Sequence, residues 1–128
     1  MHKIDIDLLP QSLKEKSLSS TEVVLRCEDI LTAIDLIIAQ QRATIGWEIW
    51  FLYPQGQISG IIEIDGESEL YTTVDVMKRK MFESWKQYVK RTSEKAKEEI
   101  IRTNFEVNEK CNKNGVIPYF CITTINHF

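Results

Sequence analysis

The side chains that most often carry acid–base catalysis are scarce in this sequence. Its two histidines, His2 and His127, stand at the two ends of the chain. Chain ends are poorly ordered unless something ties them down, so neither histidine is expected to serve as a general base. The sequence also has no nucleophile elbow, no phosphate-binding glycine loop and no paired-histidine zinc motif. We therefore expect a protein that is not an enzyme and uses no cofactor.

One cluster of carboxylates offers metal or acid–base chemistry. Asp65, Glu67 and Glu69 fall within five residues, directly after a predicted strand. Carboxylate oxygens are ligands of divalent cations, but a hydrophilic loop that leaves a strand has the same composition. A metal-dependent enzyme is therefore the third of three hypotheses, and we expect no metal site.

The cysteines indicate neither a disulfide framework nor a zinc site. Cys27, Cys111 and Cys121 are odd in number and widely spaced. A set of disulfides needs an even number, and a zinc site favours close pairs of ligands. We expect free, buried thiols in a reducing compartment.

A short aromatic segment is the best candidate for binding. Trp47, Trp50 and Tyr53 fall within seven residues of one predicted strand. Because side chains alternate along a strand, Trp47 and Trp50 point to opposite faces, and one of them is expected in the core. The other, beside Glu48, is either an anchor for a partner protein or is covered by another element. The sequence leaves both interpretations open.

Charge is divided unevenly along the chain. The net charge is −3, but residues 1–72 hold 5 Lys/Arg and 12 Asp/Glu, whereas residues 73–128 hold 11 and 7. The acidic segment with Asp65, Glu67, Glu69 and Tyr71 lies close to the aromatic strand and favours a patch that fits a basic protein surface. The alternative is a loop that only solvates the molecule.

The basic half has a simpler interpretation. Glutamates lie among the lysines over 78–97, which is typical of a solvated helix face. Trp85 and Tyr88 offer stacking surfaces for RNA, but they share an apolar helical stripe with Met77 and Met81. We expect core packing there and no direct nucleic-acid binding, in line with the negative net charge.

Hydrophobic periodicity predicts the elements that position these residues. Ser19 and Glu22 have the spacing of a capping box, and apolar residues then recur with helical spacing, which predicts a helix over about 20–40. Residues 45–53 alternate as a strand, 54–57 have turn chemistry, and 58–64 form the returning strand, with Gly60 at a bulge or a close backbone approach. One face of the first strand is expected to carry Ile45, Trp47, Ile49, Phe51 and Tyr53.

Helical spacing returns after Thr73, the predicted N-cap, and includes Met81 in its apolar stripe. Weak helix formers at 91–94 leave open whether 73–113 form one helix or two; the second part has an apolar series that includes Ile101 and Phe105. Residues 116–125 read as a final strand, in which Pro118 predicts an edge position or a bulge.

Together these elements predict an α+β fold, in which a small antiparallel sheet, made of the hairpin and the C-terminal strand, packs against two or three helices. With 128 residues, 43% hydrophobic and 27% charged, the chain is expected to form one domain over 1–128. Two aspartates interrupt the N-terminal segment, and no apolar run approaches the ~20 residues of a membrane span. We expect a cytoplasmic protein with no membrane partner.

Two segments together resemble a known class of proteins. The apolar stretch from Ile30 to Ile37, followed by Ile45-Gly46-Trp47-Glu48-Ile49-Trp50, is similar to small cytoplasmic immunity proteins of bacterial polymorphic-toxin systems, including contact-dependent growth inhibition. The resemblance covers about residues 20–60, and Gly46, Trp47 and Glu48 are the positions that carry over. It implies a non-enzymatic protein that binds a cognate toxin domain and blocks its active site.

The leading hypothesis is therefore an immunity-type binding protein whose partner is a toxin domain, such as a nuclease with a basic groove. The expected partner-binding residues are Glu48, Trp50, Tyr53, Asp65, Glu67, Glu69 and Tyr71. The alternative is a small regulatory or adaptor domain that homodimerises through its sheet. The sequence leaves the oligomeric state open.

Overall fold

Two long antiparallel strands, β2 (Ala43–Leu52) and β6 (Ile117–Ile125), form the centre of the protein in a computed structural model. The structure describes residues 5–64, 67–70 and 78–128, with the backbone alone for 63–64 and 67–70. β-Branched and aromatic residues fill both strands, as a buried sheet favours. The predicted strand over 45–53 and the predicted strand over 116–125 are both confirmed.

The sheet has four antiparallel strands in the order β1-β6-β2-β3, where β1 is Val24–Leu25 and β3 is Ile58–Ser59. The turn between β2 and β3 contains Gly56 at φ 92°, a left-handed conformation that glycine adopts without strain. A separate two-stranded ribbon pairs β4 (Ile61–Ile64) with β5 (Glu67–Leu70). The predicted α+β class with a small antiparallel sheet is thus confirmed.

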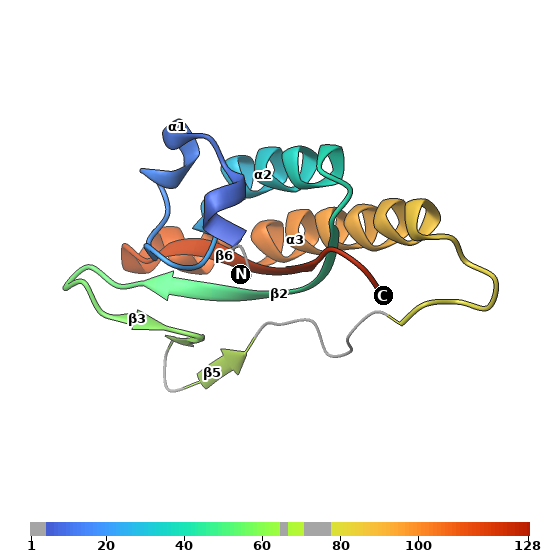
Figure 1. Ribbon diagram of the computed structural model, residues 1–128. Helices are drawn as coiled ribbons and strands as arrows, with labels where there is room; N and C mark the ends of the chain where they lie inside the picture. The colour runs from blue at the N-terminus through green and yellow to red at the C-terminus, as the bar shows by residue number, and fades with distance from the viewer. Residues whose placement is uncertain (1–4, 65–66, 71–77) are drawn as a thin grey trace.

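The helices form a second layer on one side of this sheet. A 3-10 turn (Asp5–Leu8) and the short α1 (Gln11–Lys14) precede α2 (Cys27–Ala39), and the long α3 (Trp85–Asn114) precedes β6. Figure 1 shows α2 and α3 side by side above β2 and β6, with β5 below β2. Among the described residues, no helix combines the length and the apolar composition that a membrane span requires.

The core lies between the two layers. α2 contributes Ile30, Ala33, Ile34 and Ile37, which recur at spacings of three and four and are fully buried. The sheet contributes alternate residues, which are Trp47, Ile49 and Phe51 from β2 and Phe120 and Ile122 from β6. Trp47 donates its indole N–H to Glu99 Oε1 of α3 at 3.3 Å. The expectation that one tryptophan lies in the core with a partner for its N–H is confirmed.

The first helix begins later than its sequence predicts. The hydroxyl of Ser19 accepts the backbone N–H groups of Thr21 and Glu22 at 3.2 and 3.0 Å, but a turn forms there. The β-branched pair Val23 and Val24 then leads into β1, which bonds to β6, and α2 starts only at Cys27. The predicted start near residue 20 is wrong, because pairing with a distant strand competes with local helix formation.

The segment after the hairpin also differs from the prediction. The returning strand breaks at Gly60 into β3, which pairs with β2, and β4, which pairs with β5. β5 occupies part of the segment predicted to be an acidic loop, and its register places Glu67 opposite Ile64 and Glu69 opposite Ile62. The interpretation of Glu67 and Glu69 as loop residues is therefore wrong at the level of the backbone.

α3 is one continuous helix that begins well after Thr73, which lies outside the described residues. Ser84 forms a capping box with Gln87. The helix continues through residues 91–94 because Thr92 and Ser93 are fully buried and tertiary packing outweighs their weak helix propensity. It ends at Gly115, whose φ is 65°.

Three hydrophobic residues that the sequence places on buried stripes are exposed. Met81 precedes α3 and is 85% exposed, which contradicts its assignment to the core; Met77 lies outside the described residues. Ile101 and Phe105 are 52% and 83% exposed, whereas Ala96, Ile100 and Val107 are buried as predicted. A single helix face is too narrow to bury Ile100 and Ile101 together with Phe105.

Pro118 is tolerated inside the sheet for a geometric reason. β6 is an interior strand, but the two residues of β1 pair only with Phe120 and Cys121. The backbone N–H of Ile122 points to Val23 on the β1 side, so by alternation the nitrogen of Pro118 also faces that side, beyond the end of β1. The position is thus locally an edge, as Pro118 predicted.

A partly buried ion pair between Arg91 and Glu83 holds residues 78–83 against the start of α3. Arg91 donates from Nε to Glu83 Oε2 at 2.7 Å and from a terminal nitrogen to Oε1 at 2.9 Å, and the backbone N–H of Lys80 also donates to Glu83. The hydrogen bonds from Arg91, followed by that from Lys80, lower the pKa of Glu83 to about 2. Bidentate Arg–carboxylate pairs hold a defined geometry, so this one positions residues 78–83 on the helix.

This ion pair predicts a specific acid sensitivity. Because the pKa of Glu83 falls on folding from 4.5 to about 2, its contribution to stability is present above pH ~4.5 and is lost as the pH falls toward ~2. We expect Glu83→Gln to lower stability at neutral pH and to flatten the dependence of the unfolding free energy on pH in that window. Denaturant unfolding at a series of pH values measures this. The control is Glu109→Gln, which removes an exposed partner of Lys113; equal slopes for wild type and Glu83→Gln contradict the prediction.

Candidate functional site

The alternation of β2 places two of the predicted partner-binding residues on one side of the sheet. Trp47 and Ile49 face the helices, so Glu48 and Trp50 lie on the opposite side, which we call the outer face. The register with β6 sets Glu48 opposite Cys121 and Trp50 opposite Tyr119. Directly opposite residues share a face, so Tyr119 also belongs to the outer face.

The side chains of Glu48 and Trp50 are hydrogen-bonded to each other. Trp50 donates its indole N–H to Glu48 Oε1 at 2.9 Å. Glu48 is exposed, whereas Trp50 and Tyr119 are half-buried. A carboxylate can accept several hydrogen bonds, so Glu48 retains capacity for a partner's cation, while Trp50 offers its ring. The pair is thus a fixed unit with one negative and one aromatic part.

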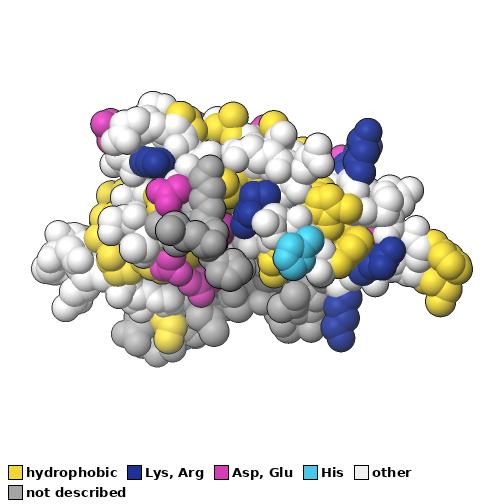
Figure 2. Space-filling view, viewed as in Figure 1, with side chains coloured by type: hydrophobic (Ala, Val, Ile, Leu, Met, Phe, Trp, Pro, Cys, Tyr) yellow, Lys and Arg dark blue, Asp and Glu magenta, His cyan; other side chains and the backbone are white. Residues whose placement is uncertain are grey.

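Negative charge extends beyond Glu48. Burial, followed by the charges of Glu22, Glu48 and Asp5, raises the pKa of the Cys121 thiol to about 12. These carboxylates come from three segments that are far apart in the sequence, which the fold gathers around β6. In Figure 2, Asp and Glu side chains gather mainly in the left half of the view, and Lys and Arg side chains mainly in the right half.

A groove of about 470 Å³ lies near this acidic region, lined in part by Glu22 and Thr123. A polar network forms part of its wall. Asp5 accepts the hydroxyl of Thr124 at 2.7 Å and a guanidinium N–H of Arg42 at 3.2 Å, and Arg42 Nε donates to the hydroxyl of Thr124 at 3.1 Å. Because Asp5 binds two partners within the chain, the network mainly ties the N-terminal segment to β6.

Tyr53, the third described candidate, lies just past the end of β2. Its hydroxyl donates to the carbonyl of Ile61 at 3.0 Å, and its half-buried ring packs against the core cluster. This contact links the hairpin to β4. These contacts give Tyr53 a structural role at the turn, and they do not place it with Glu48 and Trp50 on the outer face.

The remaining candidates have no described side chains. Asp65 and Tyr71 lie outside the described residues, and only the backbone of Glu67 and Glu69, within β5, is described. The described residues therefore bring together Glu48 and Trp50 with Tyr119. Sequence reasoning missed Tyr119; the alternation of the predicted strand 116–125 was the signal that indicated its face.

The cysteines and histidines, whose side chains could also do chemistry, were expected to have no catalytic role. Cys111 and Cys121 are buried and Cys27 is half-buried; all three thiols are free, as predicted, and burial raises the pKa of Cys111 to about 11. His127 is exposed, and His2 lies outside the described residues. Within the part of the chain that the structure describes, no three His, Cys, Asp or Glu side chains are grouped as a metal site.

The aromatic residues of the basic half are also held within the fold. Tyr88 is buried beside Val89 and Ala43, and Trp85 donates its indole N–H to the carbonyl of Gln41 at 2.8 Å. Lys97 pairs with Asp35 of α2 at 2.7 Å. The expectation that Trp85 and Tyr88 pack within the protein is confirmed.

Comparison with models of protein families, with curated proteins and with solved structures gives no match for this chain.

Proposed function

We propose that this chain is an immunity-type binding protein that neutralises a cognate toxin domain by covering its active site or substrate groove. Support comes from the resemblance of residues 30–37 and 45–50 to such proteins and from the outer face of the sheet. The single observation that carries the proposal is the hydrogen-bonded pair of Glu48 and Trp50 on that face.

The mechanism is steric and electrostatic. Glu48, with the negative charge of Glu22 near it, attracts the cations that line the groove of an enzyme acting on nucleic acid. Trp50 and Tyr119 then supply ring surface whose burial slows dissociation. The rigid β2–β6 pair holds these groups in place before binding, which lowers the entropy cost of association.

The test is co-expression with a toxin domain, taken from a neighbouring gene that encodes one. We expect the full chain to restore growth, to co-purify with the toxin domain, and to inhibit its activity in vitro at equimolar concentration. Glu48→Lys, which places a cation against a basic groove, is expected to weaken all three effects. The matched control is Glu28→Lys, the same change at an exposed position of α2.

Two results contradict the proposal, the first its function and the second its binding face. One is a chain that neither restores growth nor co-purifies with the toxin domain. The other is complete protection that is equally insensitive to Glu48→Lys and to Glu28→Lys, since it removes the outer face from the interface.

A further inference from the structure

The solvent-facing side of α3 carries a row of residues that the proposed function does not use. Positions 87, 90, 94, 98, 101 and 105 are separated by three or four residues and therefore lie on one side of the helix. We call this row the α3 strip. All six residues are exposed. It is about 27 Å long at the rise of an α-helix, and it lies opposite the side on which Val89, Ala96 and Ile100 are buried.

Exposed apolar side chains lie near each end of the α3 strip. At the C-terminal end, Ile101 and Phe105 are 52% and 83% exposed. At the N-terminal end, the exposed Met81 and Phe82 line one part of a groove of about 700 Å³, whose other lining residues are Gln87 and seven charged residues. Large apolar side chains at this exposure are costly in water and are typical of an interaction surface.

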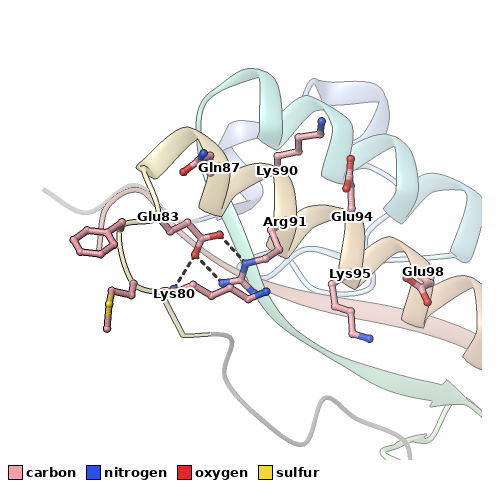
Figure 3. Close-up of a pocket in the computed structure, with 10 residues that line it drawn as sticks. Lys80, Glu83, Gln87, Lys90, Arg91, Glu94, Lys95 and Glu98 are labelled. Carbon is pink, nitrogen blue, oxygen red and sulfur yellow. Dashed lines mark hydrogen bonds and ion pairs between the residues drawn. The ribbon is translucent and has the colours of Figure 1, made fainter.

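Residues 81–83, which line the groove at the N-terminal end of the α3 strip, are held in a fixed conformation. Phe82 adopts a φ of 63°, which is unfavourable for a residue with a bulky side chain. Figure 3 shows the adjacent Glu83 joined to Arg91 of α3 and to the backbone of Lys80. The ion pair thus keeps Met81 and Phe82 presented at the end of α3.

The middle of the α3 strip carries both signs of charge. Lys90 is followed by Glu94 and Glu98, and Figure 3 shows Lys90 and Glu94 projecting on the same side of the helix. A partner of a single charge sign would be repelled either by Lys90 or by the two glutamates. A second copy of the same helix, running in the opposite direction, can instead place its cation against the first copy's anion and its anion against the first copy's cation. Such a surface is complementary to itself.

The charged residues of the α3 strip are spaced symmetrically about Glu94, as a self-complementary surface requires. Lys90 and Glu98 lie four residues before and after it, and Gln87 and Ile101 lie seven residues before and after it. A two-fold axis at Glu94 therefore sets Lys90 of one chain opposite Glu98 of the other, twice, and sets Glu94 against its own copy, so that two opposite-charge contacts stand against one like-charge contact. It also brings Ile101 and Phe105 of each chain to the end where the other presents Met81, Phe82 and Gln87. We propose that the α3 strip binds a second copy of this chain, with the two α3 helices antiparallel.

This interface is independent of the proposed function. The α3 strip faces away from the sheet, so the dimer leaves the outer face with Glu48 and Trp50 accessible to a toxin domain. A single pair of helices buries an area at the lower end of specific interfaces, so we expect a weak dimer that forms at high protein concentration.

The test is sedimentation velocity on the full chain over a wide concentration range. Lys90→Glu alone and Glu98→Lys alone each create two like-charge contacts and are expected to weaken the dimer about tenfold. The double variant restores opposite charges and is expected to return the dissociation constant to within about threefold of wild type. The control exchange, Lys86→Glu with Glu106→Lys, uses exposed positions of α3 outside the strip and is expected to change little.

A crosslink locates the axis. We expect Glu94→Cys, in a Cys27→Ser background, to form a disulfide between two chains, because residue 94 meets its own copy; Glu106→Cys is expected to form no disulfide between chains. Phe105→Ser, an exposed change that circular dichroism can show to be folded, is expected to weaken the dimer more than about tenfold. A wild type that is monomeric at every concentration overturns the proposal, as does a dimer unchanged by Phe105→Ser or not restored by the charge exchange.

Discussion

Phe120→Ala is expected to lower the free energy of unfolding by about 3–5 kcal/mol, the usual cost of removing a fully buried phenylalanine. Phe120 has no exposed surface and lies in the interior strand β6, opposite Ile49 of β2 and Leu25 of β1. Its ring centre is 5.9 Å from that of Trp47. Few neighbours can move to fill the cavity, because they belong to both layers of the core. Such a loss is a large part of the stability of a single domain.

Denaturant unfolding followed by circular dichroism measures this change. The matched control is Thr123→Ala, which shortens an exposed side chain in the same strand and is expected to change stability by less than about 0.5 kcal/mol. A loss below about 1 kcal/mol for Phe120→Ala would show that the sheet and the helices do not share the core described for them.

The long strands β2 and β6 were predictable because their signals are local. In β2 the alternation from Trp47 to Leu52 follows the buried and exposed faces of the sheet, and Gly56 marks the turn that follows. The structure departs from the predicted strands where a strand contains an extra residue or pairs with a distant segment. A bulge between Thr44 and Gly46 breaks the register, so Ile45 does not share the face of Trp47 by simple alternation.

The helix boundaries were harder to predict, because a local capping signal does not by itself decide where a helix begins. Ser19 binds the amides that a helix cap would bind, yet Val24 pairs with Cys121, which is 97 residues away in the sequence. The start of α3 is set by Ser84, whose partner Gln87 was not recognised. Sequence periodicity also includes exposed hydrophobic residues such as Phe105, because it cannot distinguish a core stripe from a surface strip.

The candidate site was predictable only in part, for the same reason. Alternation within β2 places Glu48 and Trp50 on one face without any knowledge of the rest of the chain. Their neighbour Tyr119 depends on the register between β2 and β6, which is set by long-range packing. The charge of Glu22 near Cys121 likewise depends on β1, a strand of two residues that no sequence pattern predicted.

If the outer face binds the toxin domain, Trp50→Ala is expected to weaken the complex by about 2–4 kcal/mol, or roughly 30- to 1000-fold, as for a central aromatic anchor. The loss has two parts: ring surface is removed, and Glu48 loses the N–H that orients it at 2.9 Å. Because Trp50 is half-buried on a sheet face, the variant is expected to stay folded, which thermal unfolding can check.

Binding kinetics with the purified toxin domain separate the contributions of the two residues. Trp50→Ala is expected to raise the dissociation rate, because the lost contact surface acts after docking. Glu48→Gln keeps an oxygen that can accept the indole N–H but removes the charge, so it is expected mainly to slow association and to reduce its dependence on salt. Phe105→Ala, at an aromatic residue on α3 that is 83% exposed, is the matched control and is expected to leave both rates unchanged. A complex that responds to Phe105→Ala and not to Trp50→Ala would place the toxin on the helix layer and exclude the outer face as its binding site.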